Sequence, residues 1–326
     1  MKIAVTGASG FIGSNLCNFL AVRQHHVIAL VRSIHKGTVL QSMGLQTKIC
    51  DITDRAALNI AFEDVDVVMH LAALFNNMEL SWDDFHRTNV LGLTNVLEAA
   101  RQGGVRRVIH CSTVGVATGV GRLPYSEEIP YSPLSNDKYE TTKCEAETVA
   151  LDFYRKYGFP IVVIRPAQVY GPGDRAKAKF YRLVKKRIII NPGNTLRHPI
   201  FIDDLCRAFE LAATSDQAVG EVFIIAQAEP ILLKDFIKIV AQELGVGPPI
   251  IKLPAAPITW LCMATETVSK LLRVKVPLFR RSMEFFTKSL HFDVSKASNQ
   301  LGFQSQIDVL TGVTKTAAWY KENDLL

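Results

Sequence analysis

Short apolar runs and amphipathic stretches alternate along the first half of this chain, and that alternation limits the folds open to it. Six runs rich in valine and isoleucine are expected to be strands, at residues 2–6, 26–31, 47–50, 65–70, 105–112 and 160–164. Helical patterns between them cover residues 13–22, 54–61, 82–102 and 139–157. Strands that alternate with helices of this length form βαβ units around a buried parallel sheet. Because such crossovers are right-handed, we expect an α/β fold whose doubly wound sheet carries helices on both faces.

The pattern changes near residues 165–172, where we place a domain boundary. Glycine and proline cluster at residues 170–173 and again at 191–194, with a basic helix between them. Further helices are expected at residues 203–214 and 233–244, with a strand at 221–226 between them. We expect one domain at residues 1–168, to which residues 203–226 return, and a smaller, mostly helical domain at 169–326.

Bulk composition excludes several classes of protein. The chain is 48% hydrophobic and 21% charged, which is ordinary for a soluble globular protein. Met1 runs straight into an apolar strand rather than a basic leader, and the longest apolar candidate, residues 253–264, is too short to span a bilayer. The cysteines show no C-x-x-C pairing, so we expect reduced thiols, a cytoplasmic location and no metal site. The cysteines are Cys17, Cys50, Cys111, Cys144, Cys206 and Cys262.

Positive charge is concentrated in one segment. Residues 174–197 hold eight lysines and arginines against one aspartate, a net charge of +7, whereas the whole chain carries +6. The segment lacks the modules and interleaved aromatic residues of nucleic-acid-binding proteins, so we expect no nucleic-acid partner. It would contact substrate, a membrane surface or only solvent.

A glycine turn follows the first expected strand at once and opens a helix. Gly7 permits the tight turn, Gly10 lets the backbone approach a pyrophosphate, and Gly13 lets the helix pack closely on the strand. Free N–H groups and the helix dipole would then face the phosphates. This turn in this context predicts a Rossmann-type domain that binds a nicotinamide dinucleotide. The residues expected to contact the dinucleotide here are Gly7, Ser9, Gly10, Phe11, Ile12 and Gly13.

The end of the second expected strand bears on the choice of dinucleotide. A carboxylate there would bind the ribose hydroxyls of NAD, but this chain has Arg32, with Lys36 close behind and no acid nearby. A cation suits a 2′-phosphate, so NADP(H) is favoured and NAD(H) is the alternative. An arginine exposed to solvent after a strand is the simpler explanation of the same residue.

Two further strand ends are expected to line the dinucleotide. Asp51, followed by Ile52, ends the third strand, where its carboxylate would accept a hydrogen bond from the adenine amine. The alternative is that Asp51 serves as a turn or cap residue. Small residues after the fourth strand, in Leu71, Ala72 and Ala73, leave room for the ribose of the cofactor.

Proton chemistry is indicated by a tyrosine and a lysine one helical turn apart. Tyr139 and Lys143 stand at i and i+4, so their side chains lie on one helix face. A neighbouring ammonium stabilises a phenolate and is expected to lower the pKa of the phenol toward neutrality. Ser112 and Thr113 end the fifth strand, and a hydroxyl there can hydrogen-bond a substrate oxygen as charge develops on it. Lys143 would also bond the ribose that carries the nicotinamide.

These motifs together resemble the extended short-chain dehydrogenase/reductase family, in its epimerase/dehydratase, 3β-hydroxysteroid dehydrogenase and dihydroflavonol reductase-like branch. The likeness covers essentially the whole chain. It rests on Thr6-Gly7-x-x-Gly10-x-x-Gly13, Ser112-Thr113, Tyr139-x-x-x-Lys143, Arg165-Pro166-x-x-Val169-Tyr170-Gly171-Pro172-Gly173, Phe201-Ile202-Asp203-Asp204, the segment 292–297 and Leu301-Gly302-Phe303.

The resemblance implies roles for particular residues. Tyr139 would be the acid and base, Lys143 would tune it, and Thr113 would orient the substrate. Asn89 matches a family position behind the active site, or is an ordinary helix residue. The loop after the sixth strand would meet the nicotinamide through Pro166 and Val169, with Gln168 facing the substrate. Homodimers are common in this family.

Three family reactions are open, and the sequence ranks them. Dehydration is disfavoured, because Val114-Gly115-Val116 stands where dehydratases carry an acidic pair. Epimerases hold a nucleotide diphosphate with arginines of the smaller domain, and Arg197 stands where one would fall. The apolar run at residues 253–261 instead resembles the hydroxysteroid and dihydroflavonol branch; the alternative, which is the more common case, is a buried helix of the domain core with solvated charges after it.

We therefore expect hydride transfer to or from a secondary alcohol or ketone of a bulky hydrophobic substrate. The cations that follow the apolar run, Arg273, Lys275, Arg280 and Arg281, would also suit a membrane surface. A different class, a dinucleotide-binding regulator that has lost catalysis, is disfavoured because both Tyr139 and Lys143 are present.

Overall fold

The computed structural model describes residues 1–75, 79–118, 122–133, 137–253 and 280–326. The chain divides into two compact units, each made of three segments. Unit 1 comprises Met1–Val169, Ile200–Ala228 and Phe292–Gln306, and unit 2 comprises Tyr170–Pro199, Glu229–His291 and Ile307–Leu326. The chain passes between them within β7 (Gln168–Tyr170) and β10 (Pro199–Phe201).

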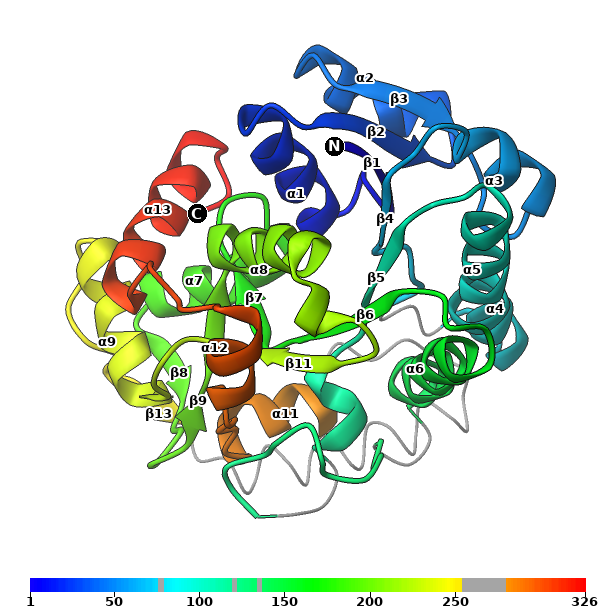
Figure 1. Cartoon of the computed structure of the whole chain (residues 1–326). Coiled ribbons are helices and arrows are strands. Elements are labelled where there is room, and N and C mark those ends of the chain that lie inside the picture. Colours follow the sequence, from blue (N-terminus) through cyan, green and yellow to red (C-terminus); the bar gives the residue numbers. More distant parts are fainter. Residues whose placement is uncertain (76–78, 119–121, 134–136, 254–279) are drawn as a thin grey trace. The chain divides into compact units, whose positions relative to one another are not determined.

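Unit 1 is built on a seven-stranded sheet in the order β11-β6-β5-β4-β1-β2-β3 (Figure 1). Every neighbouring pair runs parallel. The sheet confirms the α/β fold with a doubly wound parallel sheet. The strand from the later segment, β11, forms one edge. The strands are β1 (Lys2–Thr6), β2 (His26–Val31), β3 (Gln46–Ile49), β4 (Val67–His70), β5 (Arg107–Cys111), β6 (Ile161–Pro166) and β11 (Val222–Ile225).

Helices cover both faces of this sheet (Figure 1). On one face α1 packs against α8, and on the other α5 packs against α3 and α6. The stretch expected to be one helix at residues 82–102 is interrupted by a π-helical turn, η1. The elements are α1 (Phe11–Val22), α2 (Ile34–Ser42), α3 (Arg55–Ala61), α4 (Trp82–His86), η1 (Arg87–Leu91), α5 (Gly92–Gln102), η2 (Val114–Ala117), α6 (Lys138–Tyr157), α8 (Ile202–Thr214), η4 (Asp216–Ala218) and α12 (Ser295–Leu301).

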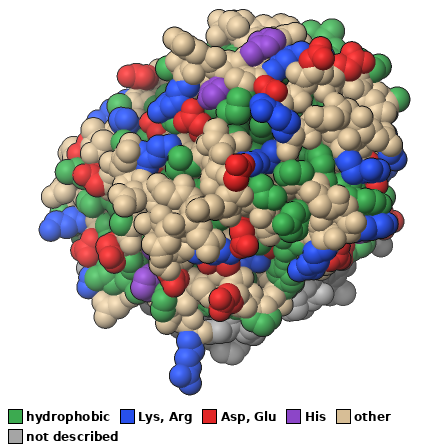
Figure 2. All heavy atoms as spheres, viewed as in Figure 1, with side chains coloured by type: hydrophobic (Ala, Val, Ile, Leu, Met, Phe, Trp, Pro, Cys, Tyr) green, Lys and Arg blue, Asp and Glu red, His purple; other side chains and the backbone are tan. Residues whose placement is uncertain are grey.

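Several surface charges of unit 1 are paired. Acidic and basic side chains are interspersed on the face shown in Figure 2. Arg101 reaches Glu98 at 3.3 Å, and Arg106 reaches Asp66 at 3.0 Å. Exposed pairs of this kind contribute little to stability, about 0–1 kcal/mol each.

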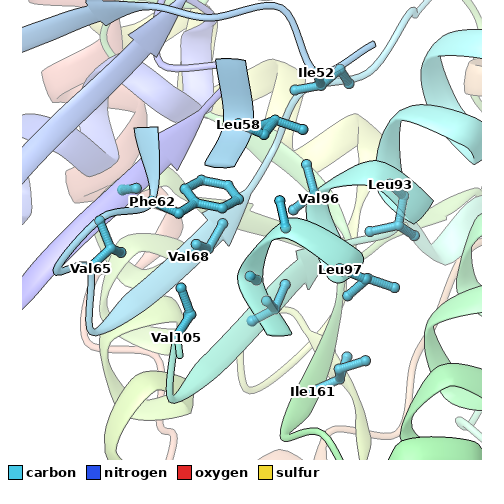
Figure 3. Close-up of a cluster of buried hydrophobic side chains, with 14 of the residues drawn as sticks. Ile52, Leu58, Phe62, Val65, Val68, Leu93, Val96, Leu97, Val105 and Ile161 are labelled. Carbon is cyan, nitrogen blue, oxygen red and sulfur yellow. The ribbon is translucent and has the colours of Figure 1, made fainter. Parts of the chain in front are cut away.

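The core of unit 1 shows why α5 takes its place on the sheet. Leu93, Val96, Leu97 and Ala100 recur at helical spacing and are all buried. Figure 3 shows the α5 side chains Leu93, Val96 and Leu97 pointing into the same cluster as Phe62 of the segment before β4. Burial of each such side chain is worth about 1.5–3 kcal/mol, so this apolar face holds α5 to the sheet.

Unit 2 consists of helices around short strand pairs. β8 runs parallel to β13, and β9 runs antiparallel to β12. Helix α9 packs against both α7 and α13. No helix within the described ranges has the length and hydropathy needed to cross a membrane. The elements are η3 (Arg175–Lys177), α7 (Ala178–Lys185), β8 (Ile188–Ile190), β9 (Leu196–Arg197), β12 (Ile231–Leu232), α9 (Leu233–Glu243), β13 (Ile251–Leu253), α11 (Arg280–Thr287) and α13 (Val309–Glu322).

A buried ion pair ties α6 to the sheet. Glu147 of α6 accepts from Nη2 of Arg165 on β6 at 2.5 Å and from its Nε at 3.0 Å, and both side chains are almost fully enclosed. The same carboxylate accepts from the hydroxyls of Ser112, at 2.6 Å, and Tyr131, at 3.0 Å. Both carboxylate oxygens of Glu147 thus accept hydrogen bonds, which is what a buried carboxylate requires.

We expect Glu147→Gln to destabilise unit 1 strongly. Removal of the carboxylate charge leaves the Arg165 guanidinium buried and uncompensated, a change that costs about 3–5 kcal/mol. The free energy of unfolding in urea measures it. Asp152→Asn is the matched control, because Asp152 lies on the same helix and pairs with Arg155 at 2.8 Å in an exposed position, where about 0–1 kcal/mol is expected. Equal losses in the two variants would show that burial of the Glu147 pair is energetically unimportant.

Candidate active site

The turn between β1 and α1 brings three backbone segments closer than side chains allow. Gly7 has φ +70°, and a Cβ on it would lie 2.7 Å from the amide nitrogen of Ala72. A Cβ on Gly13 would lie 2.2 Å from the carbonyl oxygen of Gly7. Both positions therefore require glycine. The turn is closed by the N–H of Gly10, which donates to the same carbonyl at 3.0 Å.

The amino end of α1 is shaped to receive an anion. Gly10 caps the helix without any side chain, and the first turn carries no acidic residue. The N–H groups of Phe11, Ile12 and Gly13 have no acceptor among the described residues, and the helix dipole adds positive potential at the same place. Ser9 lies exposed in the turn. These features fit the pyrophosphate of a dinucleotide, which the sequence predicts to bind at the same residues.

The ends of β2 and β3 place the residues expected near the adenosine end. Arg32 follows β2 and Lys36 lies in the first turn of α2, and both are exposed with no carboxylate partner among the described residues. Asp51 is exposed, and its Oδ1 accepts from the N–H and the hydroxyl of Thr53 at 2.9 and 2.8 Å. This contact corresponds to the alternative in which Asp51 serves as a turn residue, and it occupies one of the two carboxylate oxygens. Ile52 is buried against α5.

The end of β4 lies directly beside the glycine turn. The N–H of Leu71 donates to the carbonyl of Thr6 at 3.3 Å, and the N–H of Ala72 donates to the Thr6 hydroxyl at 3.2 Å. Ala73, next along the chain, is exposed. Because neighbouring parallel strands end at the same edge of the sheet, this segment and the turn lie side by side.

Thr113 and Tyr139 meet although they lie on different elements. Thr113 follows β5 and caps η2 through its Oγ1, which accepts from the N–H of Gly115 at 3.2 Å. Tyr139 lies in the first turn of α6, and its side chain hydrogen-bonds Thr113. Its ring packs edge-on against Phe75 at 4.8 Å. The structure therefore brings together two hydroxyls that can contact one substrate oxygen.

The expected effect of Lys143 on the pKa of Tyr139 is not what the structure shows. Burial raises the pKa of Tyr139 well above its usual value, and the hydrogen bond with Thr113 only partly opposes this. Lys143 Nζ instead donates to the carbonyl of Cys111 at 2.6 Å and approaches Nε2 of His110 at 3.3 Å. The expectation of a lowered phenol pKa is therefore wrong, because enclosure of the phenol outweighs stabilisation of its anion.

Lys143 itself has an altered proton affinity. Its side chain is buried, and burial lowers the pKa of the ammonium to about 8, although Cys111 and the Glu147 carboxylate oppose this shift. An ammonium close to its titration point at neutral pH is common where a group has a catalytic task.

A pair of buried histidines behind Lys143 was not expected from the sequence. His70 and His110 occupy paired positions on β4 and β5, and their rings stack at 5.5 Å. Burial lowers the pKa of His70 to about 3 and that of His110 well below its ordinary value, so both are neutral. His70 hydrogen-bonds the Thr6 hydroxyl at 2.8 Å. The only sequence signal for this pair is that both histidines fall near the ends of expected neighbouring strands.

Asn89 joins the loop after β4 to α6. It is buried in the π-helical turn, where its Oδ1 accepts from the N–H of Leu74 at 2.7 Å. Its Nδ2 donates to the Leu74 carbonyl at 3.2 Å and to the hydroxyl of Thr142 at 2.9 Å. Thr142 directly precedes Lys143, so Asn89 positions the helix that carries the Tyr–Lys pair.

Several other candidates are placed individually. The hydroxyl of Ser112 is engaged with Glu147, so its side chain is directed into the interior. Pro166 ends β6 and is buried, whereas Gln168 and Val169 on β7 are partly exposed.

Arg197 lies in the interior of unit 2. Its Nη2 donates to the carbonyl of Glu284 at 2.9 Å and also to that of Phe285, and its guanidinium lies over the Phe285 ring at 4.7 Å. Burial lowers the pKa of Arg197 to about 10. Apart from Leu253, the apolar run at residues 253–261 lies outside the described residues, as do Arg273, Lys275 and the side chains of Arg280 and Arg281.

A doubly wound sheet with a glycine cradle at its first helix and a Tyr–Lys pair at the carboxyl ends of its strands defines an enzyme of the short-chain dehydrogenase/reductase type. Within that class, the chain belongs to the NAD dependent epimerase/dehydratase family, whose model matches residues 3–226. The enzymes of this family are NAD-dependent dehydrogenases, reductases and epimerases.

The known relatives include dehydrogenases and reductases as well as epimerases. The chain is 30% identical to 3beta-hydroxysteroid-dehydrogenase/decarboxylase isoform 1 of Arabidopsis thaliana, over 96% of this chain and 78% of that protein. It is 28% identical to the 4-hydroxy-2-methyl-3-oxo-4-farnesyl-3,4-dihydroquinoline-1-oxide ketoreductase of Stigmatella aurantiaca, over 94% and 93%. It is also similar to the crystal structure of UDP-glucuronic acid 4-epimerase from Bacillus cereus in complex with NAD, with a TM-score of 0.77, 26% identity and coverage of 99% and 97%.

We expect the pH profile of kcat/KM for ketone reduction to have an alkaline limb that is caused by deprotonation of Lys143. Because the pKa of Lys143 is lowered to about 8, the group is charged below that pH and neutral above it. The pKa of Tyr139 is raised, so the phenol stays protonated over the same range. A role for the ammonium then predicts that kcat/KM for reduction falls as the pH rises through about 8, roughly tenfold per pH unit.

Lys143→Arg provides the comparison for this profile. An arginine keeps its charge to much higher pH, so the limb should disappear even if the rate is lower throughout. A limb that persists unchanged in Lys143→Arg would assign it to another group.

Proposed function

We propose that this chain is an NADP(H)-dependent oxidoreductase that moves a hydride between the nicotinamide and a secondary alcohol or ketone of a bulky hydrophobic substrate. Steroid-like, flavonoid-like and lipid-like compounds belong to this class. The observation that carries the proposal is that the side chain of Arg197 is already engaged within the protein. Arg197 is the residue expected to hold a nucleotide diphosphate in an epimerase. Its guanidinium is buried and bound to backbone carbonyls of unit 2.

The surroundings of Arg197 in unit 2 favour an apolar ligand. Phe180 of α7, Phe236 of α9 and Phe285 of α11 are each partly exposed and pack against one another, with ring centroids 6.2 Å apart for Phe180 and Phe236 and 5.6 Å for Phe180 and Phe285. Aromatic side chains of this kind bind flat or isoprenoid ligands by burial of apolar area. Two relatives are named for such molecules, a hydroxysteroid and a farnesylated quinoline oxide.

The residues of unit 1 supply the proton chemistry of the proposed reaction. When bound, the nicotinamide supplies or takes up the hydride. In reduction, the Tyr139 hydroxyl donates a proton to the substrate oxygen, and in oxidation the same oxygen takes the proton back. Thr113 gives a second hydrogen bond to that oxygen as its charge develops. The raised pKa of Tyr139 keeps it protonated at neutral pH, which suits the direction of ketone reduction.

The remaining polar groups position this pair. Lys143 is anchored on the Cys111 carbonyl, from where its charge would attract the ribose hydroxyls and the developing oxyanion. Asn89 holds the adjacent Thr142 and thereby the turn of α6 between Tyr139 and Lys143. The alternative function is epimerisation of a nucleotide sugar, which the likeness to the UDP-glucuronic acid 4-epimerase favours. That reaction would need a diphosphate clamp other than Arg197.

A substrate panel separates the two functions. We expect the protein to oxidise hydroxysteroids or reduce prenylated ketones, which is followed by the absorbance of the reduced nicotinamide. We expect it to leave UDP-glucose and UDP-glucuronic acid unconverted. Tyr139→Phe should lose at least about a hundredfold in kcat, a typical loss for a general acid, while its affinity for the dinucleotide is unchanged. Conversion of a UDP-sugar without net nicotinamide reduction would replace the proposal with the epimerase. An active Tyr139→Phe variant would refute the role of the tyrosine.

Arg32 is proposed to read the 2′-phosphate that distinguishes NADP(H) from NAD(H). Its exposed and unpaired guanidinium at the end of β2 can bind phosphate oxygens in a charge-assisted contact worth about 1.5–3 kcal/mol. Arg32→Ala should therefore weaken NADPH binding about tenfold to a hundredfold and leave NADH binding nearly unchanged. Quenching of protein fluorescence by each dinucleotide measures both affinities. Arg106→Ala, at the opposite ends of the strands, is the control, and equal losses for both dinucleotides in Arg32→Ala would exclude this reading of Arg32.

A further inference from the structure

Helix α7 presents a stripe of positive charge on its outer face. Lys179, Arg182, Leu183 and Lys186 stand at i, i+3, i+4 and i+7, so they share one side of the helix, and all four are exposed. The opposite side is buried, where Tyr181 packs edge-on against Tyr320 of α13 at 4.8 Å. The packing of unit 2 thus fixes which side of α7 faces outward.

The cations of this stripe have no ion-pair partner among the described residues, whereas several surface arginines of unit 1 are paired. In unit 1, Arg101, Arg106 and Arg155 each contact a carboxylate at 2.8–3.3 Å. No carboxylate contacts Lys179, Arg182 or Lys186 within the part of the chain that the structure describes. The acid at the start of this segment, Asp174, is buried and bound by Lys177 at 2.6 Å. The charges of the stripe are therefore not neutralised by ion pairs with the described residues of unit 2.

Exposed apolar side chains adjoin the carboxyl end of the stripe. Ile250 and Ile251 donate their N–H groups to the carbonyl of Arg187, the residue that follows Lys186. Ile250 is 67% exposed and Ile251 51% exposed, and Leu183 within the stripe is 36% exposed. Large aliphatic side chains beside unpaired cations are the composition of a segment that rests on a bilayer surface.

We propose that this outer face of α7, together with Ile250 and Ile251, docks on a membrane surface that contains anionic phospholipid. Lysines and arginines are attracted to the negative headgroups, and aliphatic side chains enter the boundary between headgroups and acyl chains. A nucleic acid or a soluble polyanion would satisfy the cations alone and leave the isoleucines in water. The proposal goes beyond the oxidoreductase function, although a substrate that partitions into lipid would be reached from such a surface.

Co-sedimentation of the full chain with vesicles tests the docking. We expect binding to vesicles of phosphatidylcholine with phosphatidylglycerol, weakening as salt is added, and little binding to phosphatidylcholine alone. Each surface cation is worth roughly fivefold in partitioning, so Lys179→Gln/Arg182→Gln/Lys186→Gln should bind about a hundredfold more weakly. Leu183→Ser/Ile250→Ser/Ile251→Ser should also bind more weakly but keep the salt dependence of the parent protein.

A matched triple variant separates the stripe from net charge. Arg101→Gln/Arg106→Gln/Arg155→Gln removes the same number of charges from unit 1, and equal loss of vesicle binding in both triples would overturn the proposal. Unchanged binding of the serine variant would overturn the apolar contact, and tighter binding of a short DNA duplex than of anionic vesicles would replace the membrane with nucleic acid. Melting temperature and NADPH binding confirm that each variant is folded, and both are independent of whether the proposed substrate is correct.

Discussion

The geometry of the candidate site depends on how helix α6 is held against the sheet. Four of its side chains are polar and buried, and three of them have a partner on a different element: Thr142 on Asn89, Lys143 on the Cys111 carbonyl, and Glu147 on Arg165. An apolar interface would hold the helix as firmly but would tolerate small slides along it. Directional contacts at three points fix rotation and register together, and Tyr139, one turn before Lys143, inherits its position from them.

Burial also sets the charge states within the site. The same enclosure raises the pKa of the Tyr139 phenol and lowers that of the Lys143 ammonium, because each shift favours the uncharged form. The imidazoles of His70 and His110 are neutral for the same reason. The Lys143 ammonium therefore lies beside two neutral imidazoles, and in such a low-dielectric place its field acts over a longer distance.

Local pattern was enough to predict the sheet and the glycine turn. The strands and the requirement for glycine at residues 7 and 13 follow from periodicity and from the strand–turn–helix context, which are properties of short segments. The π-helical turn around Asn89 and the stacked histidines depend on packing between elements far apart in the chain. The direction of the Tyr139 pKa shift was mispredicted, because enclosure cannot be read from the spacing of two residues.

Arg197 shows how the surroundings of a residue decide what its side chain can bind. A guanidinium that is to bind a diphosphate must keep its N–H groups free and hydrated, or held by carboxylates that release it. Here the guanidinium lies over the Phe285 ring and donates to backbone carbonyls of α11, and its Nε is enclosed. To release it would break those bonds and expose the aromatic face, a cost that a ligand would have to offset from its own binding energy. In this chain the arginine therefore packs against the aromatic cluster of unit 2, and this is the basis of the proposed preference for apolar ligands over charged ones.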